Sequence, residues 1–404
     1  MKPTVYLRQF GCPMRSLNNQ VLKELLIEND IKITEDIENA DYKILNTCGF
    51  AKETIDVSIK EINRAIQYDG KTIVTGCLPG IMPSLIPENP NLYIIPVKDI
   101  NNLIKLLKLE KKEFFKEPHY YQENNSHGEN EYYKLKDILK GFKANKSFFH
   151  VIQRRLSLFV QHTKVKDRAL FKKQAIKISE GCVLNCSFCG IKHAIGKLRS
   201  KSEESIVAEY EQLLNEGFRN LVLLADDTGS WGLDIKKTFP DLLTSLANTD
   251  KSKKGQWFLQ DLNPFWAVKY QKELAYFIED GRFFEILFSV QSGSNKILNL
   301  MNRKYEIESV VNMLSEFQKL NPRLRMLSNF IIGFPNETEA DFQATLDFIG
   351  LFNFEFIYLM KYFENETGSS KDIYPKVDEE IIMERIAKAE AYMKKRKIPF
   401  RTVY

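Results

Sequence analysis

The spacing of apolar and polar positions in the first 108 residues switches repeatedly between a strand period and a helix period. Apolar or alternating runs at 5–10, 42–47, 72–76 and 93–97 predict strands. Apolar residues spaced three or four apart at 16–28, 52–67 and 100–107 predict helices. Strands that alternate with helices indicate a parallel, doubly wound sheet. We therefore expect an N-terminal α/β domain over residues 1–108.

The pattern breaks between residues 109 and 173, which we interpret as a linker or insert. Residues 117–133 are polar and rich in turn formers. A basic block follows, with twelve Lys or Arg and two Asp from Lys134 to Lys173, although the whole chain carries a net charge of only +5. This block is suited to an acidic partner, a peptide or nucleic acid, and a solvated helix face explains it equally well.

Strand and helix patterns resume at residue 174. Strands are predicted at 175–179, 220–224, 256–259, 284–290, 326–332 and 354–362, with helices between them, for example at 202–215 and 306–320. Six strand–helix units in series predict a partial (β/α)6 barrel over 174–377. A charged helical pattern at 378–397 then predicts a C-terminal helix and tail over 378–404.

Composition places the chain among ordinary globular proteins, with 44% hydrophobic and 27% charged residues in 404. No run approaches the roughly 18 consecutive apolar residues of a membrane span, so no membrane association is expected. The N-terminus runs directly into a strand pattern and shows no secretory cleavage signal. We expect a cytoplasmic protein, in which reduced cysteines favour metal or cluster binding over disulfides.

The six cysteines fall into two sets of three. Cys182, Cys186 and Cys189 form a compact C-x-x-x-C-x-x-C motif directly after a predicted strand, at the edge where a barrel of this kind keeps its active site. Three thiolates can hold a four-iron cluster and leave one iron open to a ligand. Zinc is the alternative, because His193 follows Cys189 by four positions and would complete a closed structural site.

The second set is spread along the N-terminal domain. Cys12, Cys48 and Cys77 each follow a predicted strand, in the segments V-Y-L-R-Q-F-G-C, Y-K-I-L-N-T-C and T-I-V-T-G-C. The carboxyl ends of parallel strands meet at one edge of a sheet, where ligands gather. Residues distant in sequence can therefore form one site, and two sets of cysteines suggest two clusters with different tasks.

Further candidates are small or polar residues at the ends of predicted strands in the barrel. A small-residue turn lets backbone and amide groups approach a bound cofactor, a glycine leaves room for a base, and carboxylates can contact a cofactor or the substrate. An ordinary loop role explains each position equally well, since barrel mouths are polar. The candidate cofactor contacts are Gln291, Ser292, Gly293, Ile332, Gly333, Asp226 and Asp227.

These motifs resemble those of a known family. The compact motif, with Phe188 beside Cys189, is similar to the signature of radical S-adenosylmethionine (SAM) enzymes. F-G-C-P-M (10–14), N-T-C-G-F (46–50) and T-G-C-L-P (75–79) resemble the N-terminal domain of radical SAM methylthiotransferases. S-V-Q-S-G-S (289–294), M-N-R-K-Y (301–305) and I-I-G-F-P-N-E-T (331–338) resemble their core. G-C-P and N-T-C-G-F look closer to the branch that modifies an aspartate of a ribosomal protein than to the tRNA branch.

The resemblance implies two 4Fe-4S clusters and SAM. Cys182, Cys186 and Cys189 would hold the cluster that cleaves SAM, and Cys12, Cys48 and Cys77 would hold the auxiliary cluster that carries sulfur. The family usually ends in a TRAM β-barrel, and no such module follows the final helix pattern here. The basic insert within 109–173 is also longer than the usual linker.

The implied reaction replaces an unactivated C–H bond with C–S–CH3 and uses two SAM. It demands no general base, and we assign no catalytic side chain beyond the clusters. The expected partners are a reductant such as flavodoxin or ferredoxin, a sulfur source and the substrate. We expect a peptide or protein substrate, with a ribosomally synthesised peptide natural product as one form. The alternatives are adenosine in tRNA, or a non-catalytic iron–sulfur or zinc scaffold.

Overall fold

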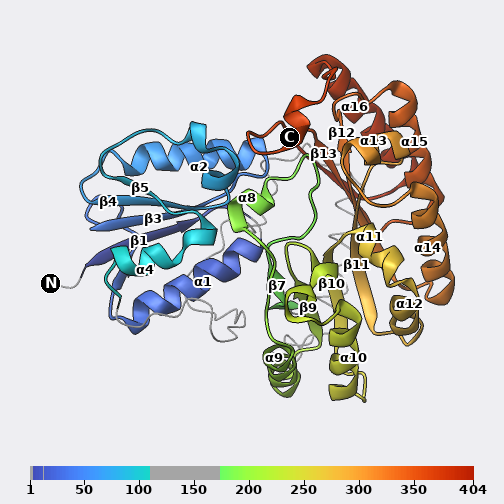
Figure 1. Cartoon of the computed structure of the whole chain (residues 1–404), viewed down its shortest axis with the longest axis horizontal. Coiled ribbons are helices and arrows are strands. Elements are labelled where there is room, and N and C mark those ends of the chain that lie inside the picture. The colour runs from blue at the N-terminus through green and yellow to red at the C-terminus, as the bar shows by residue number, and fades with distance from the viewer. Residues whose placement is uncertain (1–2, 12, 110–172) are drawn as a thin grey trace.

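Two parallel β-sheets, each flanked by helices, make up most of the part of the chain that the structure describes (Figure 1). The computed structural model describes residues 3–11, 13–109 and 173–404. Cys12 and nearly all of the predicted insert, including the basic block except Lys173, lie outside the described residues. The α/β fold class, with a doubly wound sheet followed by a barrel-like sheet, is confirmed.

The first sheet has five parallel strands in the order β2-β1-β3-β4-β5. Its strands are β1 (Thr4–Gln9), β2 (Lys32–Thr34), β3 (Tyr42–Thr47), β4 (Lys71–Gly76) and β5 (Leu92–Ile94). Its helices are α1 (Pro13–Glu28), α2 (Lys52–Ala65), α3 (Leu78–Ile81) and α4 (Asn101–Leu106). Helices α1 and α4 cover one face and α2 the other, which gives two separate apolar clusters and a doubly wound layer (Figure 1).

Strand β2, the short helix α3 and the start of helix α1 differ from the sequence prediction. The edge strand β2 has only three residues, and its K-I-T sequence is too short to show a period. Helix α1 begins at Pro13, three residues before its predicted start, because a proline is well tolerated in the first helical turn. The early start brings the helix directly after the position of Cys12.

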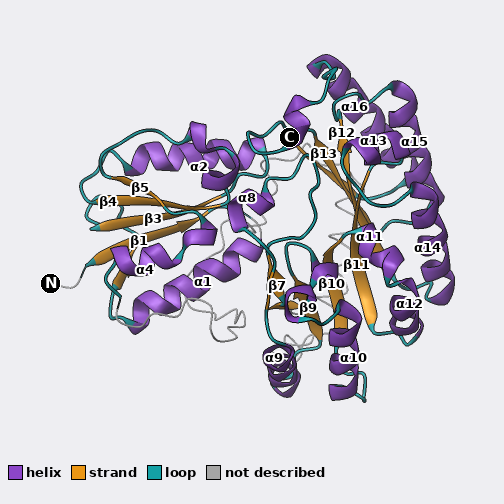
Figure 2. Cartoon of the chain, in the orientation of Figure 1, coloured by secondary structure: helices purple, strands orange, loops and turns teal. Residues whose placement is uncertain are grey.

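The second sheet has seven parallel strands in the order β14-β13-β12-β11-β10-β9-β6 (Figure 2). These are β6 (Lys173–Lys177), β9 (Asn220–Leu224), β10 (Gln256–Leu262), β11 (Phe283–Gln291), β12 (Arg325–Ile332), β13 (Phe356–Lys361) and β14 (Phe400–Val403). From β9 to β13 each strand pairs with the next strand in sequence, as the partial barrel predicts. A short antiparallel ribbon, β7 (Ser179–Glu180) with β8 (Arg199–Ser200), lies beside it.

Helices cover the convex side of this sheet, and their apolar residues join those of the strands in the largest core cluster. They are α9 (Glu203–Asn215), α10 (Phe239–Thr249), α11 (Pro264–Lys269), α12 (Gln271–Glu279), α13 (Asn295–Leu300), α14 (Ile307–Leu320), α15 (Glu339–Leu351) and α16 (Glu379–Arg396). The short helix α8 (Ile191–Ile195) packs instead against α3 of the first half.

The tail after the last helix is a strand, where the sequence analysis predicted only a helix and tail. Strand β14 pairs in parallel with β13, with Ile357 opposite Phe400. Its F-R-T-V sequence favours a strand, but four residues after a long helix carry too little periodicity to predict one. The barrel sheet therefore has a seventh strand that covers the edge of β13.

Helix α1 belongs to the first sheet in sequence but also packs on the second. Met14 and Leu17 are buried against Val222, Leu224 and Phe258 of β9 and β10. Burying each such side chain contributes roughly 1.5–3 kcal/mol. Figure 1 shows α1 and α8 between the two halves of the molecule.

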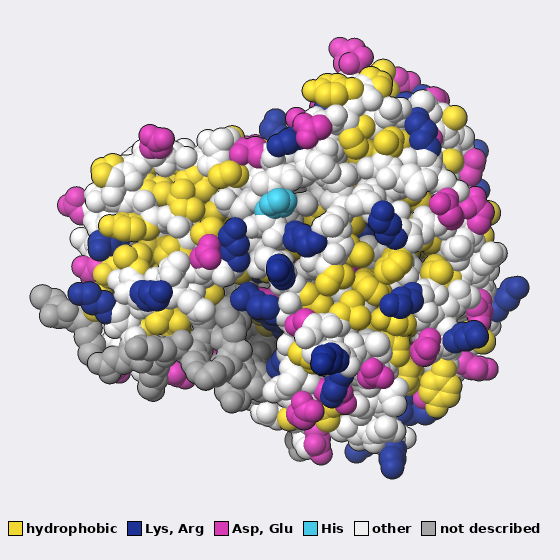
Figure 3. Space-filling model, viewed as in Figure 1, with side chains coloured by type: hydrophobic (Ala, Val, Ile, Leu, Met, Phe, Trp, Pro, Cys, Tyr) yellow, Lys and Arg dark blue, Asp and Glu magenta, His cyan; other side chains and the backbone are white. Residues whose placement is uncertain are grey.

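In the described parts of the chain, 3–109 and 173–404, we find no helix with the length and apolar character of a membrane span. On the face shown in Figure 3, Lys and Arg side chains gather along the middle, where the two halves meet.

Candidate active site

The compact cysteines lie on the loop between β7 and α8, at the carboxyl edge of the barrel sheet. The Cys182 thiol donates to Asp227 Oδ2 at 3.6 Å and accepts a hydrogen bond from Leu184 N–H at 3.3 Å. Burial, and secondly the neighbouring Cys186, raises the pKa of Cys189 to about 12. Burial also raises the pKa of Cys182, with Asp227 as the next cause. The thiols are thus close enough to interact electrostatically, and all three are only partly exposed.

Arg303 supplies positive charge to this loop. Its side chain is buried, and it donates to Cys186 Sγ at 3.5 Å and to the Ser289 carbonyl at 2.7 Å. Its guanidinium lies 5.5 Å from the centre of the Phe188 ring. The M-N-R-K-Y motif therefore places a fixed cation against the sulfurs, where thiolates would need compensation.

Two segments anchor the cysteine loop from outside. Ser187 N–H donates to the Met301 carbonyl at 3.0 Å, and Asn365 Nδ2 donates to the Phe188 carbonyl at 2.8 Å. A β-carbon on Gly368 would lie only 2.8 Å from the Ser187 carbonyl oxygen. The sequence analysis missed Asn365 and Gly368. The turn-forming run N-E-T-G-S after the last predicted strand was the available signal.

The described members of the spread set lie at one edge of the first sheet. Cys48 and Cys77 directly follow Thr47 and Gly76, which are opposite each other on β3 and β4. Both cysteines are buried, and Cys77 N–H donates to the Thr47 carbonyl at 2.9 Å. A β-carbon on Gly11 would lie 3.3 Å from Cys48 Cβ, so the chain that leads into Cys12 runs against Cys48. Cys12 itself lies outside the described residues.

The two cysteine-bearing regions pack directly against each other. Helix α3 begins after Cys77, helix α8 begins after Cys189, and these two helices are in contact. The contact is tight, because a β-carbon on Gly80 would lie 2.4 Å from Ala194 Cα. A β-carbon on Gly190 would lie 2.8 Å from Ile81 Cγ1. The glycines thus let two short helices, each next to a cysteine, approach at backbone distance.

Asp226 makes a second connection between the two cysteine-bearing regions. It accepts a hydrogen bond from Arg15 Nη2 at 3.1 Å and another from the backbone N–H of Gly181 at 2.9 Å. Arg15 lies on α1, three residues after Cys12, and Gly181 immediately precedes Cys182. Both side chains of the ion pair are buried, at 1% and 7% exposure. The structure gives Asp226 a bridging position between the halves, whereas the sequence analysis expected a cofactor or substrate contact.

Asp227 and Asp261 bring two further carboxylates to the mouth of the barrel. Asp227 is 3% exposed and accepts a hydrogen bond from Trp266 Nε1 at 2.8 Å through Oδ2. Burial raises its pKa to about 6. Burial, followed by Asp226 and Asp227, raises the pKa of Asp261 to about 7. The sequence analysis missed Asp261, because polar Gln260 and Asp261 end the apolar run, and the predicted strand stopped at 259.

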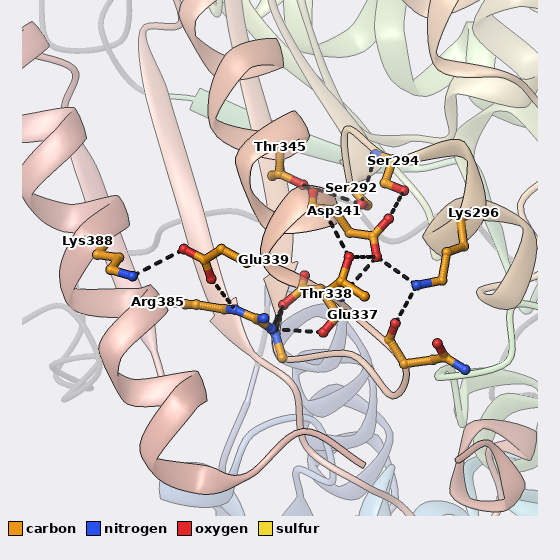
Figure 4. Close-up of polar contacts among 12 residues, drawn as sticks. Ser292, Ser294, Lys296, Glu337, Thr338, Glu339, Asp341, Thr345, Arg385 and Lys388 are labelled. Carbon is orange, nitrogen blue, oxygen red and sulfur yellow. Dashed lines mark hydrogen bonds and ion pairs between the residues drawn. The ribbon is translucent and has the colours of Figure 1, made fainter. Parts of the chain in front are cut away.

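The Q-S-G-S turn after β11 is fixed to helix α15 (Figure 4). Gly293 N–H donates to Thr345 Oγ1 at 3.0 Å, and the Ser292 hydroxyl lies 3.4 Å from the same oxygen. A β-carbon on Gly293 would lie 2.4 Å from the Ala344 carbonyl oxygen. Helix packing therefore accounts for the small residues of this turn. Gln291 differs, since it is 5% exposed and its Oε1 has no hydrogen-bond partner among the described residues.

Ile332 and Gly333 end β12 beside α16. Ile332 is buried, and a β-carbon on Gly333 would lie 2.4 Å from Ile382 of α16. Gly333 N–H donates to Glu337 Oε2 at 2.9 Å, and Arg385 holds the same oxygen at 3.0 Å (Figure 4). Gly333 is thus needed for close packing, and it also lines a cavity of about 320 Å³ that reaches Lys52 of α2.

In the described part of the chain, no group of three or more His, Cys, Asp or Glu side chains is arranged to hold a single metal ion. A zinc ion needs its ligands at about 2.0–2.3 Å from one point. Thiolates of a cluster bind different irons and are spaced more widely. His193, the fourth ligand of the zinc alternative, is exposed on α8.

Comparison with known proteins assigns the family. The model of the radical SAM superfamily matches residues 176–349, and that of the uncharacterized protein family UPF0004 matches residues 4–94. The ribosomal protein uS12 methylthiotransferase RimO of Francisella tularensis subsp. novicida is 26% identical over 398 residues, which cover 95% of this chain and 80% of the relative. The chain belongs to the radical SAM methylthiotransferase family. It lies nearer to the RimO branch than to the tRNA branch.

Relatives of this methylthiotransferase also include tRNA enzymes. The probable threonylcarbamoyladenosine tRNA methylthiotransferase of Methanocaldococcus jannaschii is 26% identical, over 98% of this chain and 86% of the relative. Among solved structures, the radical SAM methyltransferase TsrM from Kitasatospora setae superposes with a TM-score of 0.60 at 12% identity, covering 88% of this chain and 72% of TsrM. At that identity the likeness shows a shared fold.

The methylthiotransferase family uses SAM and two 4Fe-4S clusters, and the described residues fit these groups. Cys182, Cys186 and Cys189 converge on one loop beside the cation of Arg303. Asp227 Oδ1 and Gln291 Oε1 are buried hydrogen-bond acceptors without donors among the described residues. Buried acceptors of this kind are costly unless a ligand or water supplies donors. SAM carries ammonium, amine and hydroxyl donors.

Proposed function

We propose that this methylthiotransferase replaces an unactivated C–H bond of a peptide or protein with C–S–CH3, using two SAM per turnover. One SAM would give its methyl group, and the other would leave as methionine and 5′-deoxyadenosine. When bound, the clusters would supply the electron that cleaves SAM and the site that carries sulfur. The observation that carries this proposal is the direct packing of the Cys77 helix against the Cys189 helix.

The same geometry supports an assignment of the cysteines to the two clusters. We propose that Cys182, Cys186 and Cys189 hold the cluster that cleaves SAM, and that Cys12, Cys48 and Cys77 hold the auxiliary cluster. The burial of Cys48 and Cys77 and the partial burial of Cys182, Cys186 and Cys189 support this assignment, because they limit the access of water to reactive groups.

For SAM we propose direct contacts from Asp227 and Gln291, whose acceptor atoms need donors. We propose that Ser292, Gly293, Ile332 and Gly333 shape the pocket through backbone position, and that Asp226 acts on the cofactor through the loop it holds. No catalytic base is required, since the chemistry is that of the cofactors.

Charge supports a peptide substrate. Asp226, Asp227 and Asp261 gather at the barrel mouth, and acidic groups there disfavour a phosphate-bearing substrate. Outside the mouth, the exposed Lys98 lies against the turn that carries the exposed Lys197, since a β-carbon on the adjacent Gly196 would be 3.6 Å from Lys98 Cβ. This basic surface, with the basic block of the insert, suits the acidic leader of a ribosomally synthesised peptide.

The second candidate is adenosine in tRNA. A relative named as a probable threonylcarbamoyladenosine tRNA methylthiotransferase is also 26% identical to this chain, and the basic insert would then bind phosphates. A low-potential reductant such as flavodoxin or ferredoxin, a sulfur source and a cytoplasmic location belong to either proposal.

The test uses the full chain, reconstituted anaerobically with iron and sulfide and supplied with SAM and reductant. Separate reactions contain ribosomal protein uS12, short peptides with acidic leaders, or bulk tRNA. We expect mass spectrometry to find a methylthio group on a protein or peptide and none on tRNA nucleosides. Methylthiolation of tRNA alone would replace this proposal with the second candidate.

A further inference from the structure

Asp261 occupies a distorted position at the end of β10. Leu259 is opposite Ile286 and Leu262 is opposite Phe288, so three residues of β10 span the distance of two on β11. This is a β-bulge, a device that re-aims a side chain next to many active sites. Asp261 also has φ of +54°, which is uncommon for a residue other than glycine. The carboxylate is therefore turned out of the regular strand alternation by a specific local structure.

The neighbours of Asp261 belong to both cysteine-bearing halves. Of the two carboxylates near Asp261, Asp226 is bonded to Arg15 of α1, and Asp227 contacts the Cys182 thiol. Both carboxylates are close enough to raise the pKa of Asp261, and the Ser289 hydroxyl hydrogen-bonds to it. Asp261 thus lies at the junction between the half that carries Cys12, Cys48 and Cys77 and the half that carries the compact motif.

Among the described residues at this junction, Asp261 is the carboxylate whose negative charge is not balanced by a nearby cation. Arg15 compensates Asp226, and Arg303 lies on the side of Asp227 and the cysteines. Within residues 3–11, 13–109 and 173–404, no Lys or Arg forms an ion pair with Asp261. A half-buried carboxylate without a cation costs free energy in the folded protein unless a ligand donates to it.

A second observation points to a ligand. Asp227 is 97% buried, and its Oδ1 has no hydrogen-bond partner among the described residues, although Oδ2 is held by Trp266. Among the described residues, the junction therefore presents Asp227 Oδ1, from the loop after β9, without a donor, and Asp261, on β10, with the Ser289 hydroxyl but without a cation. SAM would supply the donor for Asp227, as proposed above, and an N–H group of a ligand beside SAM would supply a donor for Asp261.

We propose that Asp261 binds the substrate, accepting a hydrogen bond from an N–H group of the peptide close to the carbon that is methylthiolated. This inference rests on the proposed function and names the residue that recognises its substrate. A carbon that receives sulfur from one half and loses hydrogen to the other must lie between them, where Asp261 lies. The uncompensated negative charge favours the amide or ammonium groups of a peptide over a nucleotide, whose phosphates it repels.

The test compares D261N and D261A with the wild-type full chain, all reconstituted with iron and sulfide under anaerobic conditions. D347N is the matched control, since Asp347 is an exposed carboxylate on α15. Iron content confirms that each variant has loaded its clusters. SAM affinity is measured by equilibrium dialysis with labelled SAM. Product is measured on whichever of uS12, acidic-leader peptides or tRNA the wild type modifies, as methylthio groups formed per 5′-deoxyadenosine released.

We expect D261N and D261A to bind SAM within twofold of the wild type and to lose at least tenfold in product per 5′-deoxyadenosine, with D347N unchanged. A tenfold loss of SAM affinity would instead assign Asp261 to the cofactor and overturn the inference. Unchanged product yield would overturn it as well. Failure of the proposed function is seen separately, because it appears in the wild type as modification of tRNA or of no substrate. If the wild type modifies no substrate, the SAM affinity of D261N and D261A remains the readout, and a tenfold loss of that affinity still overturns the inference.

Discussion

Arg15 and Asp226, 211 residues apart in sequence, form a buried ion pair at 3.1 Å that ties the first half of the molecule to the second. Asp226 also receives the N–H of Gly181, beside Cys182. One carboxylate therefore reaches from the helix after Cys12 to the residue before the compact motif. The pair fixes two distant cysteine regions relative to each other, which a reaction between two clusters requires.

Breaking this pair is expected to be costly. D226N or R15M leaves a buried charge uncompensated, so we expect each to lower the free energy of unfolding by about 3–5 kcal/mol. The double variant R15M/D226N should lose less than the sum, with a coupling of about 0.5–3 kcal/mol in a double-mutant cycle by urea denaturation. The exposed pair Lys388–Glu384 is the control, and its cycle should give about 0.5 kcal/mol or less. Additive losses at Arg15 and Asp226 would contradict the bridging role.

The cysteine assignment makes a prediction about metal content. The wild-type chain, reconstituted anaerobically, should hold about eight irons and no zinc. C182A/C186A/C189A and C48A/C77A should each retain about four irons, because each set holds one cluster. Only the second variant should still release 5′-deoxyadenosine from SAM. Elemental analysis with absorption spectroscopy measures the first result, and chromatography of the nucleoside measures the second. One zinc per chain, or complete iron loss in both variants despite folded protein, would disprove two independent clusters.

The contact between α3 and α8 predicts an effect of a single methyl group. In G80A the new β-carbon would meet the Ala194 backbone, so the helices must separate, at a cost of about 1–3 kcal/mol. Because these helices follow Cys77 and Cys189, we also expect a lower methylthio yield per 5′-deoxyadenosine. G217A is the control, since its β-carbon would meet nothing within 4 Å, although φ of +96° there adds local strain. Equal yields in G80A and G217A would show that the contact does not position the chemistry.

Local patterns in the sequence predict the strands well and the contacts between them poorly. β3 follows the predicted run at 42–47, and Cys48 and Cys77 lie at strand ends as expected, because periodicity and chain order determine both. The role of Asp226 depends on Arg15, which lies on helix α1 of the other half, and no local pattern encodes this contact. Gly293 looks like a cofactor turn in sequence, whereas its missing side chain makes room for α15.

Asp261 illustrates the same limit for a functional candidate. The bulge that turns it toward the mouth arises from the register between β10 and β11, and the sequence shows only a polar pair at the end of an apolar run. A carboxylate at a strand end is common in sequences and does not by itself indicate function. Asp261 becomes a candidate only because the folded structure shows no ion pair for it among the described residues. Motifs thus identify the cysteines, while the three-dimensional structure is needed to find the residue between them.

The environment of Asp261 also predicts how stability depends on pH. Its pKa rises to about 7 in the folded chain through burial and the nearby Asp226 and Asp227, while an unfolded aspartate titrates near 3.9. The folded state therefore binds this proton more tightly, so the contribution of Asp261 to stability is greatest below about pH 4. It is lost as pH rises toward 7. At pH 8 the ionised carboxylate opposes folding, and D261N removes that cost.

We accordingly expect apo D261N to be more stable than the apo wild type at pH 8, by about 1–3 kcal/mol. The difference should shrink at pH 5, where much of the penalty is absent. Urea denaturation at the two pH values measures both, with D347N as a control that should differ little from the wild type at either pH. A destabilised D261N at pH 8 would mean that Asp261 holds the fold together. If D261N is more stable than the wild type but forms less methylthiolated product, Asp261 serves substrate binding at the expense of stability.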